Sequence, residues 1–120
     1  MPHIQIEHSS NIKYKIDYIL FNNLITILTK LANVKPENCK CKVFKIKKYY
    51  LGSNSKKEGF INLNIKIIEG RSKKIINQIG AESLQALQLF FQPYTKDISI
   101  QYSIEIQEIK SSNYFTTNSI

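Results

Sequence analysis

With 120 residues, the chain is long enough for one hydrophobic core and too short for two, so we expect a single domain. Hydrophobic residues make up 42% of it and charged residues 22%, and no apolar run approaches the roughly 20 residues that span a bilayer. For the same reason we expect no membrane partner. The formal net charge is +8, but Arg71 is the only arginine, and nucleic-acid surfaces more often use arginine, so we expect no nucleic-acid partner either.

The first predicted strand lies at the N-terminus and carries a proline at its second position. Within Met1–Glu7, Ile4 and Ile6 alternate with polar residues, which is the period of a half-buried strand. An initiator methionine is normally trimmed before a small second residue, so Pro2 would become the N-terminus of the mature chain. A secondary amine in a rigid ring, on a strand position that needs no amide donor, is a candidate catalytic base. The alternative is an inert proline at a position where proline is common.

A helix is predicted over Lys13–Asn33 and a second strand over Cys39–Tyr49. Ser9–Asn11 offers N-caps for the helix, and Pro36 ends it. Its apolar residues recur at spacings of three and four, forming one stripe of Ile16, Leu20, Leu24, Ile27, Leu28 and Leu31. On the strand, one face carries Cys39, Cys41 and Val43, and the other carries Lys40, Lys42, Phe44 and Ile46.

A turn at Gly52–Ser55 leads to a third strand over Phe60–Glu69, and we expect the two strands joined by this turn to pair. Ser72 then caps a helix that runs to about Phe91. Gly80 inside this helix costs about 1 kcal/mol relative to alanine unless something packs closely there. The apolar stripe of the helix consists of Ile76, Ile79, Ser83, Leu87 and Phe90.

The last predicted strand, Ile98–Ile109, again alternates apolar and polar residues, and a polar tail over residues 110–120 follows it. Asn113, Tyr114 and Phe115 in this tail either pack on a neighbouring subunit or belong to a frayed end.

The element order is strand, helix, strand, repeated once, which predicts an α/β protein built from two βαβ units. The two halves of this pseudo-repeat are residues 1–52 and 59–110. Together they would form a four-stranded mixed sheet with both helices on one face. The other face would lack a covering layer, and association of several copies is the simplest way to cover it.

Four short motifs spread along the chain carry a family resemblance. They are the opening Pro-His-Ile-x-Ile-Glu, Gly70-Arg71-Ser72 at the head of the second helix, Gly80 in its third turn, and Glu-Ile-x-Glu at residues 105–108. With the element order and the chain length, these resemble 5-carboxymethyl-2-hydroxymuconate isomerases of the tautomerase superfamily. The resemblance implies a homotrimer in which the amino-terminal proline, here Pro2, moves a proton during keto-enol tautomerisation of a muconate-type dienol, without metal or organic cofactor.

The chemistry of an amine base agrees with this role for Pro2. A free α-amino group has a pKa of about 7.7 to 8.0, and a base that works near neutral pH must be neutral there. Burial and nearby cations disfavour the ammonium form and lower the pKa. Arg71 and the lysines of the second strand are the candidate cations.

Arg71 stands between a strand end and a helix N-terminus, where backbone amides and the helix dipole already favour anions. Its planar guanidinium group could bind a substrate carboxylate through two hydrogen bonds and stabilise a developing enolate. The resemblance assigns it to substrate binding. The alternatives are an exposed loop cation or a pair with Glu69.

The second strand departs from the family pattern, which has arginines where this chain has Lys40 and Lys42. Lysine attracts a carboxylate as a point charge but lacks the planar, two-bond recognition of arginine. We treat Lys40 and Lys42 as candidate substrate-binding residues, with a solvated lysine-rich strand face as an equal alternative.

Other chemistry is not indicated. Cys39 and Cys41 are too close in sequence to form a relaxed disulfide and are interpreted as reduced thiols. Together with His3 and His8 they do not complete a zinc spacing, so we expect no metal. The N-terminus lacks the pattern of a signal peptide, and we expect a cytoplasmic protein.

Overall fold

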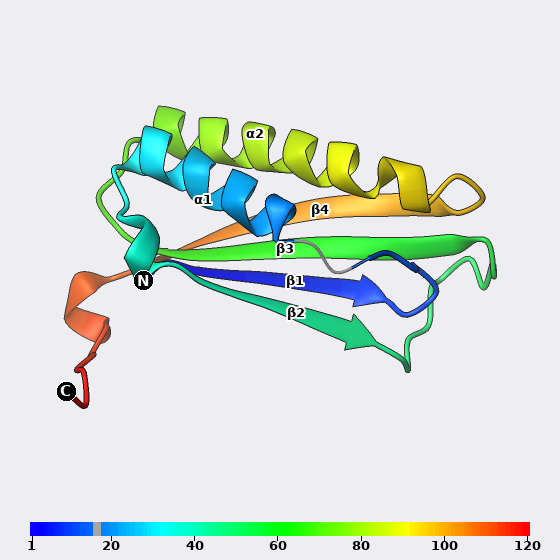
Figure 1. The fold of residues 1–120 in the computed structure, drawn as a ribbon, viewed down its shortest axis with the longest axis horizontal. Coiled ribbons are helices and arrows are strands. Elements are labelled where there is room, and N and C mark those ends of the chain that lie inside the picture. Colours follow the sequence, from blue (N-terminus) through cyan, green and yellow to red (C-terminus); the bar gives the residue numbers. More distant parts are fainter. Residues whose placement is uncertain (16–17) are drawn as a thin grey trace.

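The computed structural model describes residues 1–15 and 18–120. Four strands form one mixed sheet, and two helices lie side by side on one of its faces (Figure 1). The elements in chain order are β1 (His3–Ser9), α1 (Ile19–Ala32), β2 (Lys40–Ile46), β3 (Glu58–Ile68), α2 (Lys73–Phe91) and β4 (Ser99–Ile109), with short 3-10 turns at Pro36–Asn38, Gln92–Tyr94 and Ser111–Asn113. The predicted α/β class, with two strand-helix-strand units and both helices on one face, is confirmed.

The strand order in the sheet is β2-β1-β3-β4. Each unit keeps its two strands adjacent and parallel, β1 with β2 and β3 with β4, and the units meet through the antiparallel pair of β1 and β3. The expected pairing of the strands joined by the Gly52–Ser55 turn is therefore wrong. The two most buried strands, β1 and β3, occupy the centre of the sheet. Strand β2 is an edge strand, and its connection to β3 passes the end of β1 (Figure 1).

Helix α1 begins at Ile19 and not at Lys13, and Ser9–Asn11 does not cap it. Tyr18 occupies the N-cap position without a side-chain hydrogen bond. Ile16, which was expected on the apolar stripe, lies outside the described residues.

Polar residues at the end of β1 and directly after it instead satisfy main-chain groups at the start of β3. The Oγ of Ser9 accepts a hydrogen bond from the amide of Phe60 at 3.0 Å, and the Nδ2 of Asn11 donates to the carbonyl of Glu58 at 2.8 Å. These long-range bonds explain why the segment does not start a helix, because its capping side chains are already engaged.

Helix α2 follows the sequence prediction closely. The Oγ of Ser72 accepts a hydrogen bond from the amide of Ile75 at 3.2 Å, as an N-cap does. The buried residues recur at a spacing of four, and Phe91 takes the innermost place expected for Phe90, which is only partly buried. The buried set is Ile79, Ser83, Leu87 and Phe91.

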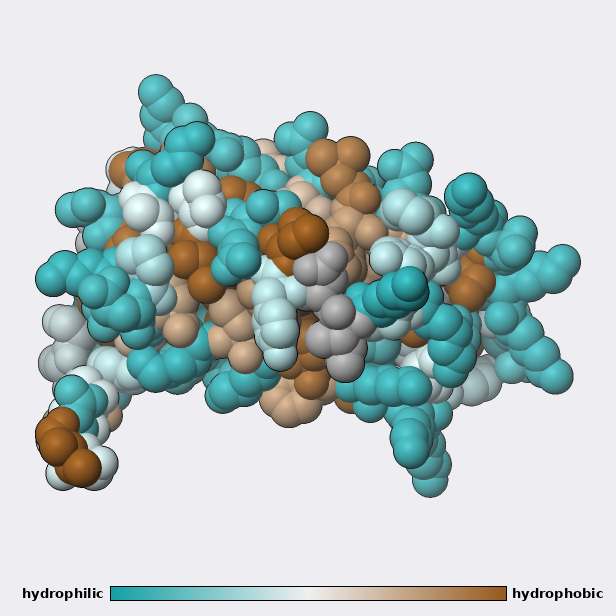
Figure 2. All heavy atoms as spheres, viewed as in Figure 1, coloured by the Kyte–Doolittle hydropathy of each residue, from teal (hydrophilic) through white to brown (hydrophobic). Residues whose placement is uncertain are grey.

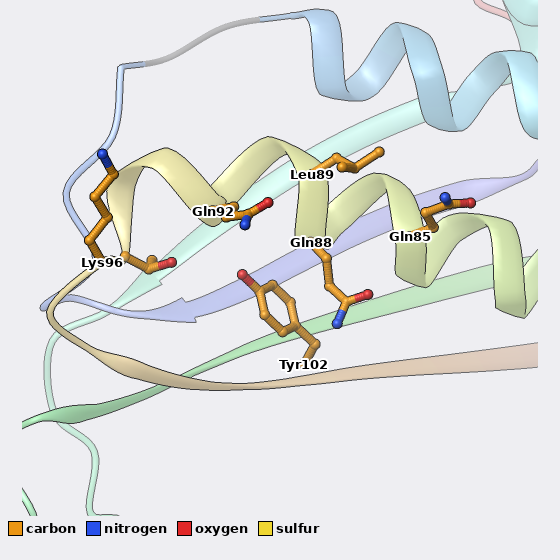
Figure 3. Close-up of a pocket in the computed structure, with 7 residues that line it drawn as sticks. Gln85, Gln88, Leu89, Gln92, Lys96 and Tyr102 are labelled. Carbon is orange, nitrogen blue, oxygen red and sulfur yellow. The ribbon is translucent and has the colours of Figure 1, made fainter.

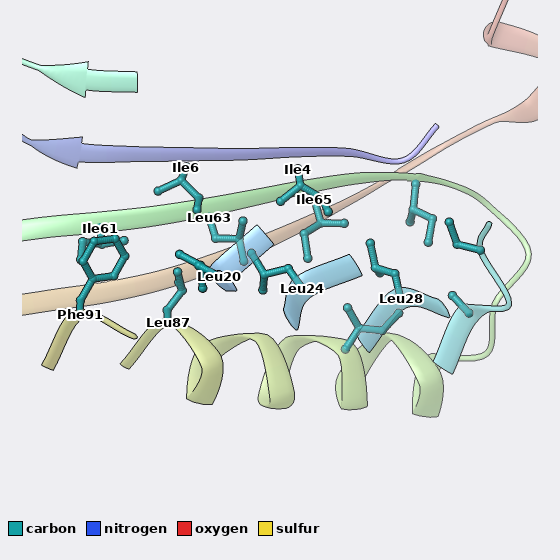
Figure 4. Close-up of a cluster of buried hydrophobic side chains, with 14 of the residues drawn as sticks. Ile4, Ile6, Leu20, Leu24, Leu28, Ile61, Leu63, Ile65, Leu87 and Phe91 are labelled. Atoms are coloured by element: carbon teal, nitrogen blue, oxygen red, sulfur yellow. The ribbon is translucent and has the colours of Figure 1, made fainter. Parts of the chain in front are cut away.

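The core lies between the sheet and the two helices. Alternate residues of β1 and β3 point toward the helices and meet the leucines of α1 and the inner face of α2 (Figure 4). The central members are Ile4, Ile6, Leu20, Leu24, Leu28, Ile61, Leu63, Ile65, Leu87 and Phe91, each at most 4% exposed. Burial of these side chains is the main source of stability, at roughly 25 cal/mol per Å² of apolar surface.

The opposite face of the sheet is polar and carries no helix. Gln5, Asn62 and Ser103 lie on it, and the hydroxyl of Ser103 donates to the Oδ1 of Asn62 at 2.7 Å. Seen from the side, the surface is mostly hydrophilic with scattered hydrophobic residues (Figure 2). Neither helix in the described part of the chain has the length and hydropathy to cross a membrane.

Gly80→Ala is expected to raise the free energy of unfolding by about 0.5 to 1 kcal/mol, because alanine favours the helix and restricts the unfolded chain. A Cβ at this position would lie 3.7 Å from the Cδ1 of Ile106, an ordinary van der Waals distance. Chemical denaturation measures the change. Gly59→Ala is the matched control with the opposite sign, since its Cβ would lie 2.7 Å from the Oγ of Ser9. Equal or lower stability of Gly80→Ala would contradict the expectation.

Candidate functional site

Pro2 is held at the head of β1 by the main chain of the neighbouring strand. Its carbonyl accepts a hydrogen bond from the amide of Lys40 at 3.1 Å, which extends the parallel ladder of β1 and β2 by one step. The ring is buried, on the side of the sheet that faces the helices. The position is therefore fixed by strand pairing as well as by packing.

The environment of the chain end disfavours a positive charge. The pKa of the Met1 amino group is lowered, first by burial and then by the nearby Lys40 ammonium, while Cys39 acts in the opposite direction. A Pro2 amine exposed by removal of Met1 would lie one residue further along the same strand. An amine in this place is more readily kept neutral than one in free solution.

Lys40 and Lys42 project from β2 on the open face of the sheet, as the alternation predicted. In register they lie beside His3 and Gln5 of β1. Both lysines are exposed, and the Nζ of Lys40 donates to the carbonyl of Asn38 at 3.3 Å. Two exposed cations thus stand at the Pro2 end of the sheet.

Arg71 lies at this same end, because β3 runs antiparallel to β1 and ends where β1 begins. Its guanidinium is engaged by two main-chain carbonyls, with Nη1 donating to Ile68 at 2.8 Å and Nη2 to Ala32 at 2.9 Å. The bonds join the end of β3 to the last residue of α1. Glu69 accepts a hydrogen bond from the amide of Ser111 at 3.1 Å, so each of these two charged groups has a main-chain partner.

The structure adds two residues to this end of the sheet that sequence reasoning missed. In register, His3 lies between Lys40 of β2 and Lys66 of β3 on the open face. The pKa of His3 is lowered, first by burial and then by Lys42, the chain amine, Lys40 and Lys66. The position of His3 next to Pro2 was a usable signal. Nothing in the sequence pointed to Lys66, which only the antiparallel pairing brings here.

The polar tail folds back toward the same region. The ring of Tyr114 meets the ring of His3 edge-on, with centroids 6.4 Å apart. Phe115 is 88% exposed. Of the two alternatives for the tail, Tyr114 packs within its own chain, and Phe115 has no such packing among the described residues.

A polar cavity lies elsewhere, between the end of α2 and edge strand β4. It has a volume of about 620 Å³ and is lined by Gln85, Gln88, Leu89, Gln92, Thr95, Lys96 and Tyr102 (Figure 3). None of the four expected site residues contributes to it. In the described part of the chain, no group of three or more His, Cys, Asp or Glu side chains is arranged to hold a metal ion.

The four-stranded mixed sheet of two βαβ units, with both helices on one face, places the molecule in the class of tautomerase-fold proteins. Residues 2–120 match the family model of 5-carboxymethyl-2-hydroxymuconate isomerase. The chain belongs to this isomerase family.

Solved structures agree on the fold. The chain superposes on a 5-carboxymethyl-2-hydroxymuconate isomerase from Deinococcus radiodurans R1 with a TM-score of 0.73 and 19% identity, covering 98% of this chain and 90% of that one. Superposition on a 5-carboxymethyl-2-hydroxymuconate delta-isomerase gives a TM-score of 0.78 at 16% identity, covering 98% of this chain and 87% of that one. A macrophage migration inhibitory factor-like protein from Entamoeba histolytica gives 0.65 at 18% identity, with 98% and 96% coverage. No match was found among curated proteins.

Proposed function

We propose that the protein is a keto-enol tautomerase for an unsaturated 2-hydroxy or 2-oxo acid such as 5-carboxymethyl-2-hydroxymuconate, with Pro2 as the general base. The observation that carries the proposal is the match of residues 2–120 to an isomerase family, a match that starts at Pro2 itself. The buried, strand-anchored position of Pro2 and the lowered pKa of the chain amine support it.

In the proposed reaction, the neutral Pro2 amine takes a proton from the enol hydroxyl or from a carbon acid, and the resulting ammonium returns a proton to another carbon of the conjugated system. Charge builds up on the dienolate oxygen and the carboxylates between the two steps. Lys40 and Lys42 bind these groups as point charges. Arg71 contributes to their binding when its guanidinium gives up a hydrogen bond to a main-chain carbonyl and donates to the substrate instead. Only protons move, so the proposed reaction needs no metal and no organic cofactor.

We further propose a homotrimer. The sheet leaves one polar face without a covering layer and has two edge strands, β2 and β4. Edge strands and an uncovered face are the surfaces through which sheets associate. Sedimentation equilibrium at three times the 13.9 kDa of one chain would support the trimer, and a monomer at assay concentration would contradict it.

The alternative function is a non-catalytic trimeric scaffold of the same fold that binds a small acid or a protein partner. The specific observation in its favour is that lysines stand at positions 40 and 42, while Nη1 and Nη2 of Arg71 each donate a hydrogen bond to a carbonyl within the chain. This alternative predicts an exposed amino-terminal proline with no tautomerase activity.

The deciding experiment is tautomerisation of a 2-hydroxymuconate-type dienol by untagged protein whose N-terminus has been confirmed by intact mass. Turnover above the spontaneous rate supports the enzyme. A chain that begins at Pro2 and has no activity would support the scaffold. The absence of nucleic-acid and membrane partners and the cytoplasmic location stay predictions, and nucleic-acid binding that weakens steeply with salt would overturn the first of them.

Lys40→Met is expected to move the acid limb of the pH profile of kcat/KM to higher pH. The Lys40 cation lowers the pKa of the Met1 amino group, and we expect it to act in the same direction on a Pro2 amine one residue further along. Its removal then lets that amine stay protonated to a higher pH. The profile is measured between about pH 5 and pH 9. Lys48→Met, which removes an exposed lysine beyond the end of β2, is the matched control and should leave the limb in place. A limb that stays or moves to lower pH in Lys40→Met would contradict the expectation.

A further inference from the structure

A second cavity lies at the opposite end of β1 from Pro2, on the face that carries the helices. Its volume is about 400 Å³, within the usual size of small-molecule sites. The walls come from the end of β1, the segment after it, the start of α1, edge strand β2 and the end of α2. His8 in this cavity is six residues along β1 from Pro2, a separation of about 20 Å in an extended strand.

The wall of this cavity is largely aromatic. Tyr14 lines it and meets four other rings edge-on: His8 with centroids 5.3 Å apart, Phe91 at 5.1 Å, Phe90 at 6.1 Å and Tyr94 at 6.4 Å. Phe21 of α1 lines it as well. Such a wall favours a flat, apolar ligand, because aromatic rings gain both buried area and edge-to-face contacts.

A buried imidazole supplies a polar group inside this wall. His8 is 2% exposed, and its Nδ1 lies 2.9 Å from the carbonyl oxygen of Ser9. A carbonyl only accepts, so Nδ1 carries the proton and donates it there. Nε2 lies on the ring edge away from this carbonyl, and no hydrogen bond within residues 1–15 and 18–120 engages it. This nitrogen can hydrogen-bond a polar group of a ligand.

The charged groups among the described lining residues are cations. Lys45 pairs with His8 in the register of β1 and β2, and its side chain is exposed on uncovered β2. Lys13 lines the same cavity, with its Nζ donating to the carbonyl of Ser10 at 2.9 Å. The described lining residues include no Asp or Glu. A ligand that fills the aromatic space would therefore be stabilised by a negative group near Lys45.

We propose that this cavity binds a small aromatic carboxylate, with its ring against Tyr14 and Phe90 and its carboxylate beside Lys45. The site is separate from the proposed catalytic proline and does not depend on it. The cavity is a second binding site for an organic acid, and it binds the acid whether or not the protein is an enzyme.

Fluorescence titration with 2-naphthoate tests the proposal, with 2-acetylnaphthalene as an uncharged probe of similar shape. We expect saturable binding of the acid and weaker binding of the ketone. Lys45→Met should lower the affinity for 2-naphthoate by about five-fold, as loss of one partly exposed charge pair does. Lys47→Met is the matched control outside the cavity and should bind like the parent. Pro2→Ala should also bind like the parent, which separates this site from the proposed function.

A cavity-filling variant and a map of the site complete the test. Val43 lines the cavity and is 40% exposed, so Val43→Trp can occupy the space without entering the core, and it should abolish binding in a protein with an unchanged circular dichroism spectrum. Amide chemical-shift changes on addition of 2-naphthoate should centre on His8 and Tyr14. The proposal is overturned by absence of saturable binding up to millimolar probe, by equal affinity of acid and ketone, or by amide shift changes that centre on His3 and Lys40, next to Pro2.

Discussion

Pro2→Ala is expected to lower kcat/KM for a 2-hydroxymuconate-type dienol by about 10²- to 10⁴-fold, the usual contribution of a positioned general base. Alanine leaves an amine at the chain end but replaces the rigid ring and the secondary amine. The main-chain bond from the amide of Lys40 to the carbonyl of residue 2 is kept by alanine, but the buried ring that fixes the direction of the nitrogen is lost. Initial rates, followed by loss of the dienol absorbance, measure the effect.

A chain that keeps Met1 provides the sharper comparison, because the ring of Pro2 then remains while its nitrogen is an amide without a basic lone pair. This protein should be at least as inactive as Pro2→Ala, and removal of Met1 with an aminopeptidase should restore turnover. If the methionine-bearing chain is fully active, the amine is not the base, and the assignment of Pro2 fails.

Arg71→Ala is expected to lower the free energy of unfolding by about 2 to 4 kcal/mol, because it removes two charge-assisted hydrogen bonds to main-chain carbonyls in a partly buried setting. The carbonyls of Ile68 and Ala32 lose their partners, which loosens the junction between β3 and α1. If Arg71 also contacts the developing charge, kcat falls and KM rises together. Denaturant titration and steady-state kinetics at a temperature where the variant is folded measure the two effects.

Leu24→Ala is the matched control for stability. It truncates a core leucine that is 1% exposed, at a typical cost of about 2 to 5 kcal/mol, and it lies outside the proposed site. Equal activity of Arg71→Ala and Leu24→Ala, both fully folded, would restrict Arg71 to a structural role. A larger loss in Arg71→Ala would place it at the substrate.

Local patterns were sufficient for most elements of the fold. The alternation of Ile61, Leu63 and Ile65 and the cap at Ser72 depend on short spacings that a sequence displays directly. The order of the strands in the sheet cannot be predicted from such short spacings, because the pairing of β1 with β3 joins segments far apart in the chain. The late start of α1 has the same cause, since the candidate cap Ser9 is used by Phe60.

The candidate site was predictable only in part, for a similar reason. Pro2 and Lys40 follow from position and strand alternation, and a hydrogen bond joins their main chains. The partners of Arg71 could not be predicted, because Ala32 lies 39 residues away in sequence. The closeness of Lys66 to His3 requires the antiparallel register, which no local pattern specifies.

The contact between His3 and Tyr114 has a practical consequence for producing the protein. Both chain termini lie at the same end of the molecule (Figure 1). An affinity tag at the N-terminus would acylate the proposed catalytic amine, and a tag at the C-terminus would begin a few residues beyond the ring that lies against His3. Purification from a tag that is cleaved without residual residues is therefore part of measuring the native chemistry, and tagged protein would report on a different molecule.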